Sequence, residues 1–122
     1  MIWSGVAALL LALAVAMGAF GAHFLRSRLD AYSMSIYERA VFYHFVHALA
    51  LLIVPLFLRS DVLAEWAAGL ICWLLVAGLV FFCGSLYLLA ITGVRALGAI
   101  TPIGGLAFIA AWLALAFFLL RR

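Results

Sequence analysis

Charged residues are scarce in this sequence, and lysine is absent. Only 9% of the 122 residues are charged and 72% are hydrophobic, whereas soluble domains are roughly half apolar and a quarter charged. The composition therefore excludes a soluble globular domain. The 7 basic residues are all arginines, and they lie at the ends of apolar runs. This distribution indicates the headgroup level of a membrane and excludes a basic patch for nucleic acid.

Cysteines and acidic residues are equally few. Cys72 and Cys83 fall in one apolar run, about 16 Å apart along a helix, which excludes an intrahelical disulfide. We expect both to be buried as small hydrophobic residues. The 4 acidic residues lie near the predicted loops, and the sequence contains no nucleophile and base pair, phosphate loop or carboxylate pair. We therefore expect no enzymatic activity and no cofactor required for catalysis.

Four apolar stretches remain, and each is long enough to cross a bilayer core about 30 Å thick. They predict an all-α, polytopic membrane protein whose four transmembrane helices form an antiparallel bundle. Residues 1–122 form one integral membrane domain, with helices at about 3–25, 36–58, 62–92 and 102–120. The first run has no basic segment before it and is too long for a signal-peptide core, so we expect it to be retained.

Several short patterns predict where these helices begin and end. Ser35 and Glu38 have the spacing of a capping box, which predicts that the second helix begins at Ile36. The other signals are Ser60 or Asp61 before the third helix, Gly93 after it, and Thr101-Pro102 at the start of the fourth.

Small residues recur at positions suited to close helix packing. Ala14, Gly18 and Ala22 repeat every fourth residue of the first helix, which predicts a face that another helix can approach closely. The other expected packing residues are Gly21, Gly84, Gly104 and Gly105. A shift of 63 positions aligns Trp3 with Trp66 and Gly21 with Gly84, which is the pattern expected of a duplicated helical hairpin.

Polar side chains at membrane depth mark a candidate site. Arg39, Tyr43 and His47 follow each other at intervals of four residues and share one face of the second helix. One interpretation is a polar track into the membrane with His47 as its deepest member. The other is a core histidine bonded to another helix, for example to Ser85 or Tyr87.

His23 and His47 offer a third possibility, because imidazole binds metal ions and haem iron. They lie on adjacent antiparallel helices. However, His23 is near the membrane surface, and no other residue is placed to complete a metal site. We therefore predict no metal ligand among the site residues.

Four segments resemble a family of small four-helix membrane proteins known as DUF423, which includes bacterial inner-membrane proteins of the YgdD type and transmembrane protein 256 of eukaryotes. The segments are GAFGAH at 18–23, Tyr43 with HALALL at 47–52, GSLYLLA at 84–90 with Thr92-Gly93, and ITPIGGL at 100–106. His44 and Arg39 depart from the pattern, which usually has glutamine and threonine there. The resemblance implies a multi-pass protein of the bacterial inner membrane and no established activity.

Three functional hypotheses follow. The first is a non-enzymatic protein that acts through helix contacts in the lipid bilayer, as a homo-oligomer or as an accessory subunit with other membrane proteins. The second is a small transporter or channel that uses Tyr43 and His47. The third is haem or metal binding by His23 and His47.

Overall fold

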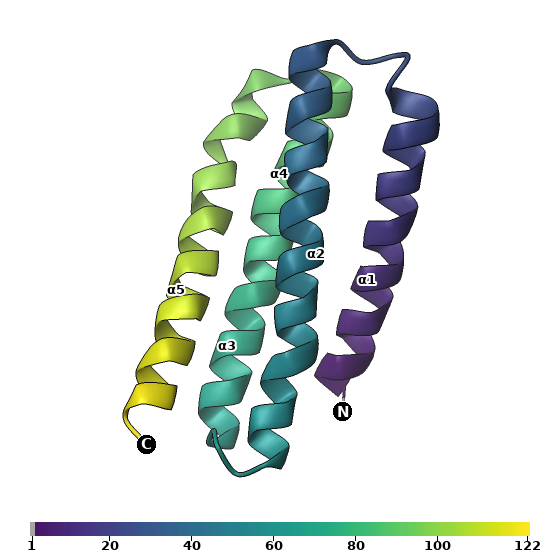
Figure 1. Ribbon diagram of the computed structural model, residues 1–122. Coiled ribbons are helices and arrows are strands. Elements are labelled where there is room, and N and C mark those ends of the chain that lie inside the picture. The colour runs from purple at the N-terminus through teal and green to yellow at the C-terminus, as the bar shows by residue number, and fades with distance from the viewer. Residues whose placement is uncertain (1) are drawn as a thin grey trace.

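The apolar runs form the long helices of a bundle in the computed structural model, which describes residues 2–122 (Figure 1). Within these residues, four helical segments are long and apolar enough to cross a membrane: Ile2–Leu25, Ala31–Arg59, Glu65–Thr92 and Arg95–Leu120. No strand occurs in the same residues. The predicted all-α membrane architecture is therefore confirmed.

The first and third spans each contain a π-helical turn, a local widening of the helix that often accompanies functional sites. The first span consists of α1 (Ile2–Phe20) and the π-helix η1 (Gly21–Leu25), and the second is α2 (Ala31–Arg59). The third consists of α3 (Glu65–Gly78), the π-helix η2 (Leu79–Cys83) and α4 (Gly84–Thr92). The fourth consists of the 3₁₀ helix η3 (Arg95–Ala99) and α5 (Thr101–Leu120).

The start of α2 differs from the prediction. The helix begins at Ala31, because the Asp30 side chain caps it by accepting a hydrogen bond of 2.7 Å from the backbone N–H of Ser33. Ser35 lies inside the first turns, and its hydroxyl donates to a backbone carbonyl three residues earlier. Glu38 forms an ion pair across the loop. The predicted capping box is therefore wrong, since an earlier aspartate had already provided the cap.

The other helix ends agree with the sequence in part. Gly93 closes α4 with a φ of 71°, in the left-handed region that glycine accepts most easily, as predicted. Neither Ser60 nor Asp61 caps α3, which begins at Glu65 without a side-chain cap. Ser60 instead ends α2, where its N–H bonds to carbonyls of the last turn. The prediction for α3 was wrong because the polar turn belongs to the preceding helix.

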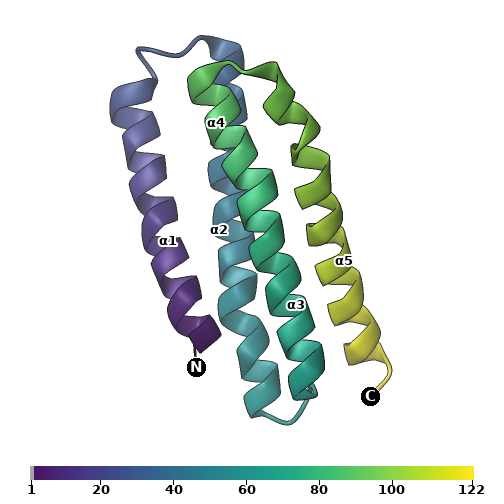
Figure 2. The ribbon, with the colours of Figure 1, turned by 180° about the vertical axis from the view of Figure 1, so that it is seen from behind.

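α2 and the α3–α4 span form the centre of the bundle, and α1 and α5 pack on its two sides (Figures 1 and 2). Within the most apolar stretch of each span, 39% of the residues are buried for the two central spans and 17% for the two outer ones. Both termini lie at the same end of the bundle (Figure 1). Of the polar residues of α2, His44 and His47 are buried between helices, whereas Glu38 and Arg39 are exposed.

Two clusters of buried side chains hold the helices together. The larger centres on α2 and α3 and includes Leu51, Ile71 and Leu75. The smaller lies near the first loop around Tyr37, whose hydroxyl donates a hydrogen bond to the Met17 carbonyl of α1. The free cysteines Cys72 and Cys83 are both buried, as predicted.

The predicted duplication of a helical hairpin stays a prediction. The repeat pairs α1 with α3, and these two helices have different environments, since α1 is an outer helix and α3 a central one. The π-helical turns also fall at different positions, at Gly21–Leu25 in the first span and Leu79–Cys83 in the third.

Candidate functional site: two histidine clusters on α2

His47 lies in the middle of α2 and faces α5. Its Nδ1 is 2.8 Å from the carbonyl oxygen of Tyr43, and its Nε2 is 3.1 Å from the indole nitrogen of Trp112. The imidazole stacks on Phe108, with the ring centroids 3.6 Å apart. With 5% of its surface exposed, His47 is a buried contact between α2 and α5.

The two hydrogen bonds of His47 assign its tautomer. A carbonyl oxygen only accepts, so the hydrogen lies on Nδ1 and is donated to Tyr43. An indole N–H only donates, so Nε2 of His47 is the acceptor for Trp112. The imidazole is therefore neutral, and a proton or ligand could reach Nε2 only by displacing Trp112.

Arg39, Tyr43 and His47 share a face of α2 but lie in different environments. Arg39 is exposed, Tyr43 is half-buried, and His47 is buried. Tyr43 bonds to His47 through its backbone carbonyl and not through its hydroxyl. Its ring packs on Phe82, with the centroids 4.6 Å apart. The arrangement is a stack of aromatic rings between α2, η2 and α5 and not a chain of polar side chains.

His44 faces away from α5, toward the third span. Its Nδ1 is 2.8 Å from the hydroxyl of Tyr87 on α4, and only 3% of the residue is exposed. Its Nε2 is buried without a hydrogen-bond partner, the only side-chain nitrogen or oxygen of this kind in residues 2–122.

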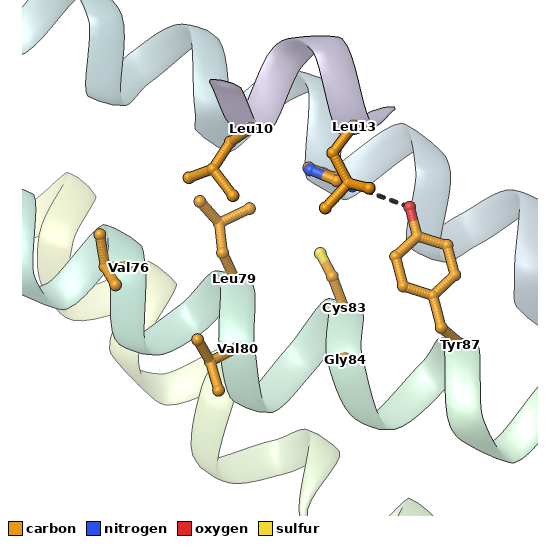
Figure 3. A pocket seen from close by; sticks show the side chains of 9 residues that line it. Leu10, Leu13, Val76, Leu79, Val80, Cys83, Gly84 and Tyr87 are labelled. Carbon is orange, nitrogen blue, oxygen red and sulfur yellow. Dashed lines mark hydrogen bonds between the residues drawn. The ribbon is translucent and has the colours of Figure 1, made fainter. Parts of the chain in front are cut away.

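A cavity of about 210 Å³ lies beside His44, between α1 and the third span (Figure 3). Its walls are almost entirely apolar, and they come from Leu10, Leu13, His44, Val76, Leu79, Val80, Cys83, Gly84 and Tyr87. Leu13 and Val80 are 49% and 59% exposed, so the cavity is open on the membrane-facing side of the bundle. The hydroxyl of Tyr87 and its hydrogen bond lie at one end (Figure 3).

Ser85 and Tyr87 bond to residues other than His47. The buried Ser85 hydroxyl lies 2.6 Å from that of Thr101 and connects α4 to the start of α5. α5 begins at Thr101, so this residue is the first of the helix and not its cap, which is Ile100. Tyr87 bonds to His44. The partner of His47 is on α5, a helix that the sequence interpretation did not consider.

His23 lies far from His47. It is exposed in η1, whereas Gly21 nearby packs on Tyr37 of α2. The antiparallel register places His23 about level with Ser35, so His47 lies roughly 18 Å further along α2 at 1.5 Å per residue. No group of three or more His, Cys, Asp or Glu residues in the described part of the chain could hold a metal ion. The structure does not bring the two histidines into one site.

The small residues of the first span contact α2 unevenly. Ala14 is buried, and a Cβ on Gly18 would make an ordinary contact with Val41 at 3.5 Å. A Cβ on Gly21 would lie 2.3 Å from the ring of Tyr37, so only glycine allows this approach. Ala22 is exposed. The face that packs on α2 therefore passes through Gly21 and not through Ala22.

The glycines of the third and fourth spans differ in the same way. A Cβ on Gly104 would lie 2.2 Å from the backbone nitrogen of Phe82, whereas one on Gly105 would be 3.7 Å from the ring of the same residue. A Cβ on Gly84 would have no neighbour within 4 Å. Gly104 is therefore the residue that sets the approach of α5 to η2.

Sequence reasoning missed three of the residues that define these contacts. Trp112 and Gly78, which packs on Phe108, gave no signal because their surroundings are uniformly apolar. For His44 the sequence did contain an indication of its partner. Cys83 and Tyr87 lie one turn apart on the third span and form a face with polar atoms that a histidine could contact. Pairing that face with His44 required knowledge of the helix arrangement.

The fold and its buried polar pairs define a small multi-pass integral membrane protein. The family model described as "Protein of unknown function (DUF423)" matches residues 17–105, more than half of the chain. The chain is 51% identical over 104 residues to a UPF0382 membrane protein of Staphylococcus epidermidis, covering 84% of this chain and 82% of that protein. It is 44% identical over 101 residues to the UPF0382 membrane protein YwdK of Bacillus subtilis, covering 83% and 81%.

The chain therefore belongs to the DUF423 family, as its sequence motifs indicated. It is an integral protein of the bacterial cytoplasmic membrane, consistent with the names and organisms of these relatives. No solved structure matches it.

Proposed function

We propose that this protein is non-enzymatic and acts through helix contacts, as a homo-oligomer that assembles through the outer face of α1. The observation that carries the proposal is a row of small, exposed residues on that face: Gly5, Ala8, Ala12, Ala16 and Ala19. At 3.6 residues per turn they fall within an arc of about 80°. They lie opposite Ala7 and Ala14, which are buried.

The outer face of α5 provides a contrast. Large side chains dominate this face, as expected where acyl chains are the neighbours, with Ala110 and Ala116 as its small exposed residues. The large residues include Ile103, Leu106, Ile109 and Leu113. In lipid, helix association depends on close packing and not on hydrophobic burial, so a face without large side chains suits a second helix better. The α1 face therefore fits a partner helix, and the α5 face fits lipid.

The polar residues inside the bundle support a non-enzymatic role. His47 uses one ring nitrogen for a hydrogen bond within α2 and the other for a hydrogen bond to Trp112 on α5, and Ser85 bonds to Thr101. Both pairs hold α5 in place. The charged side chains of Arg26, which follows η1, and Glu38 of α2 are exposed and pair with each other.

Cysteine cross-linking in native membranes tests the proposal. Two copies related by a twofold axis would bring Ala12→Cys residues close enough for a disulfide, which requires Cα atoms about 4.4–6.8 Å apart. We expect copper phenanthroline to link Ala12→Cys into dimers. The native Cys72 and Cys83 are buried and do not compete.

Ala110→Cys is the matched control, because Ala110 is exposed on α5. It should stay monomeric under the same oxidation. Ala12→Ile should abolish self-association measured by single-molecule photobleaching in liposomes, and Ala110→Ile should not. Finding the wild type always as a lone monomer would disprove the proposal. If Ala12→Cys cross-linked only to a different protein, the homo-oligomer would be disproved, and the result would favour an accessory subunit of a larger complex.

A further inference from the structure

The Nε2 atom of His44 has an unmet hydrogen bond in the middle of the membrane. His44 is the fourteenth residue of α2, about 20 Å from Ala31 along the axis, and α2 has 29 residues. Water is not available at that depth, and an unpaired polar atom there is costly. His44 lies in the wall of the cavity between α1 and the third span. Because Nε2 is itself covered, a partner in the cavity reaches it when a lining side chain moves.

The surroundings of His44 indicate which hydrogen bond is missing. The hydroxyl of Tyr87 has Nδ1 of His44 as its hydrogen-bond partner, so it donates its hydrogen there and Nδ1 is the acceptor. A neutral imidazole whose Nδ1 accepts carries its hydrogen on Nε2. In this arrangement Nε2 is a free donor, and the partner that it lacks is an acceptor such as a carbonyl oxygen.

The cavity restricts the size and polarity of that partner. Its volume of about 210 Å³ exceeds the roughly 150 Å³ of an engineered apolar cavity that binds benzene. Its walls are aliphatic side chains, a thiol and the Tyr87 ring, so a charged ligand is unsuitable. The opening beside Leu13 and Val80 allows a longer substituent to extend into the lipid.

We propose that this cavity binds a neutral, lipid-soluble molecule with one carbonyl-bearing ring, of the quinone class, and that His44 Nε2–H donates a hydrogen bond to the ring carbonyl. Tyr87 holds the imidazole in the required tautomer and is a positioning residue. Leu13, which is half exposed to lipid, adjusts its rotamer as the ring enters. The site is separate from the outer face of α1.

Duroquinone, a tetramethyl benzoquinone, is the probe, and durene is its control, because durene has the same methylated ring without carbonyls. The wild type is reconstituted in phosphatidylcholine nanodiscs with ¹⁵N-labelled histidine. We expect duroquinone to raise the melting temperature saturably and to shift the Nε2 resonance of His44 but not those of His23 and His47. Durene should do neither. Equal responses to the two compounds would show an apolar slot only and overturn the proposal.

Substitutions at His44 and Leu13 separate the contribution of the hydrogen bond from that of the cavity shape. His44→Phe removes the donor and should weaken duroquinone binding about tenfold or more, whereas His44→Gln keeps an N–H donor and should retain most of it. If His44→Phe does not fold, Leu13→Phe decides the question. It fills the cavity from α1, leaves the pair of His44 and Tyr87 intact, and should abolish binding.

Unchanged duroquinone binding in Leu13→Phe would overturn the proposal, because the compound would then bind elsewhere. Ala12→Ile, which removes the proposed oligomer contact, should bind duroquinone like the wild type. The two variants therefore distinguish failure of the ligand-binding proposal from failure of the homo-oligomer proposal.

Discussion

The indole N–H of Trp112 on α5 donates a hydrogen bond of 3.1 Å to Nε2 of His47 on α2. The same imidazole stacks on Phe108, one turn before Trp112 on α5. One histidine therefore contacts α5 through both its edge and its face. α5 packs mainly on α3 and η2, and this contact adds a connection to the central helix α2.

Trp112→Phe should loosen the contact between α5 and α2. The substitution keeps an aromatic ring but leaves Nε2 of His47 buried without a donor, at a cost of about 0.5–2 kcal/mol in the free energy of unfolding. Unfolding in mixed detergent and SDS micelles, followed by circular dichroism, measures the change. Trp66→Phe is the control, because Trp66 is 66% exposed.

A double-mutant cycle with His47→Phe isolates the hydrogen bond from other effects of the two substitutions. The coupling free energy between His47→Phe and Trp112→Phe should be favourable. It should equal the loss in the free energy of unfolding that Trp112→Phe causes alone. A coupling of zero would contradict the assigned hydrogen bond.

Gly104→Ala and Gly105→Ala should have opposite effects on stability, although the residues are adjacent. The Gly104 Cβ would lie 2.2 Å from a backbone nitrogen of η2, which cannot move without shifting the helix, so we expect a loss of about 1–3 kcal/mol. The Gly105 Cβ has room at 3.7 Å, and alanine is the better helix former, by about 0.5–1 kcal/mol. The same unfolding measurement compares them, and equal losses would contradict the close approach of α5 to η2.

The sequence was sufficient for the membrane class and the number of spans because long apolar runs have few alternatives to spanning helices. It was also sufficient for Gly93, where the conformation depends on one residue. It was not sufficient for the start of α2. Asp30 and Ser35 are both good caps, and the choice between them depends on how far the first loop must reach.

The candidate site could be predicted only as a set of residue types. His47 is correctly a polar residue inside the bundle, but its partner Trp112 lies 65 positions away on a helix whose side was unknown. Helix periodicity places residues on faces, and it does not say which helix covers each face. For the same reason, the sequence could not predict the pair of His44 and Tyr87.

Tyr87→Phe and Tyr43→Phe should differ although both residues lie in the bundle. The Tyr87 hydroxyl bonds to His44 at 2.8 Å, so its loss leaves the histidine with both ring nitrogens unpaired and costs about 1 kcal/mol or more. The Tyr43 hydroxyl has no hydrogen bond in the described chain, and its ring contacts remain in phenylalanine. Tyr43→Phe should therefore be nearly neutral. Equal effects of the two substitutions on SDS unfolding would contradict this assignment.

Acid should loosen the first turn of α2 through Asp30. The hydrogen bonds that the carboxylate accepts from the backbone and side chain of Ser33 lower the pKa of Asp30 below its ordinary value of 3.8. Because the folded state has the lower pKa, the cap stabilises the helix fully above pH 3.8, and this contribution is lost as the pH falls through the lowered pKa. The ¹⁵N–¹H resonance of the Ser33 amide in nanodiscs, followed from pH 6 to about pH 2, should report the loss.

Two variants test whether this titration belongs to the cap. Asp30→Asn keeps a side-chain acceptor without a titrating group, so the Ser33 amide should become insensitive to acid in this range. Ser35→Ala should leave both the helix start and its pH dependence unchanged, because Ser35 lies inside the helix. An acid response of the Ser33 amide that persists in Asp30→Asn would show that the titration does not belong to the cap.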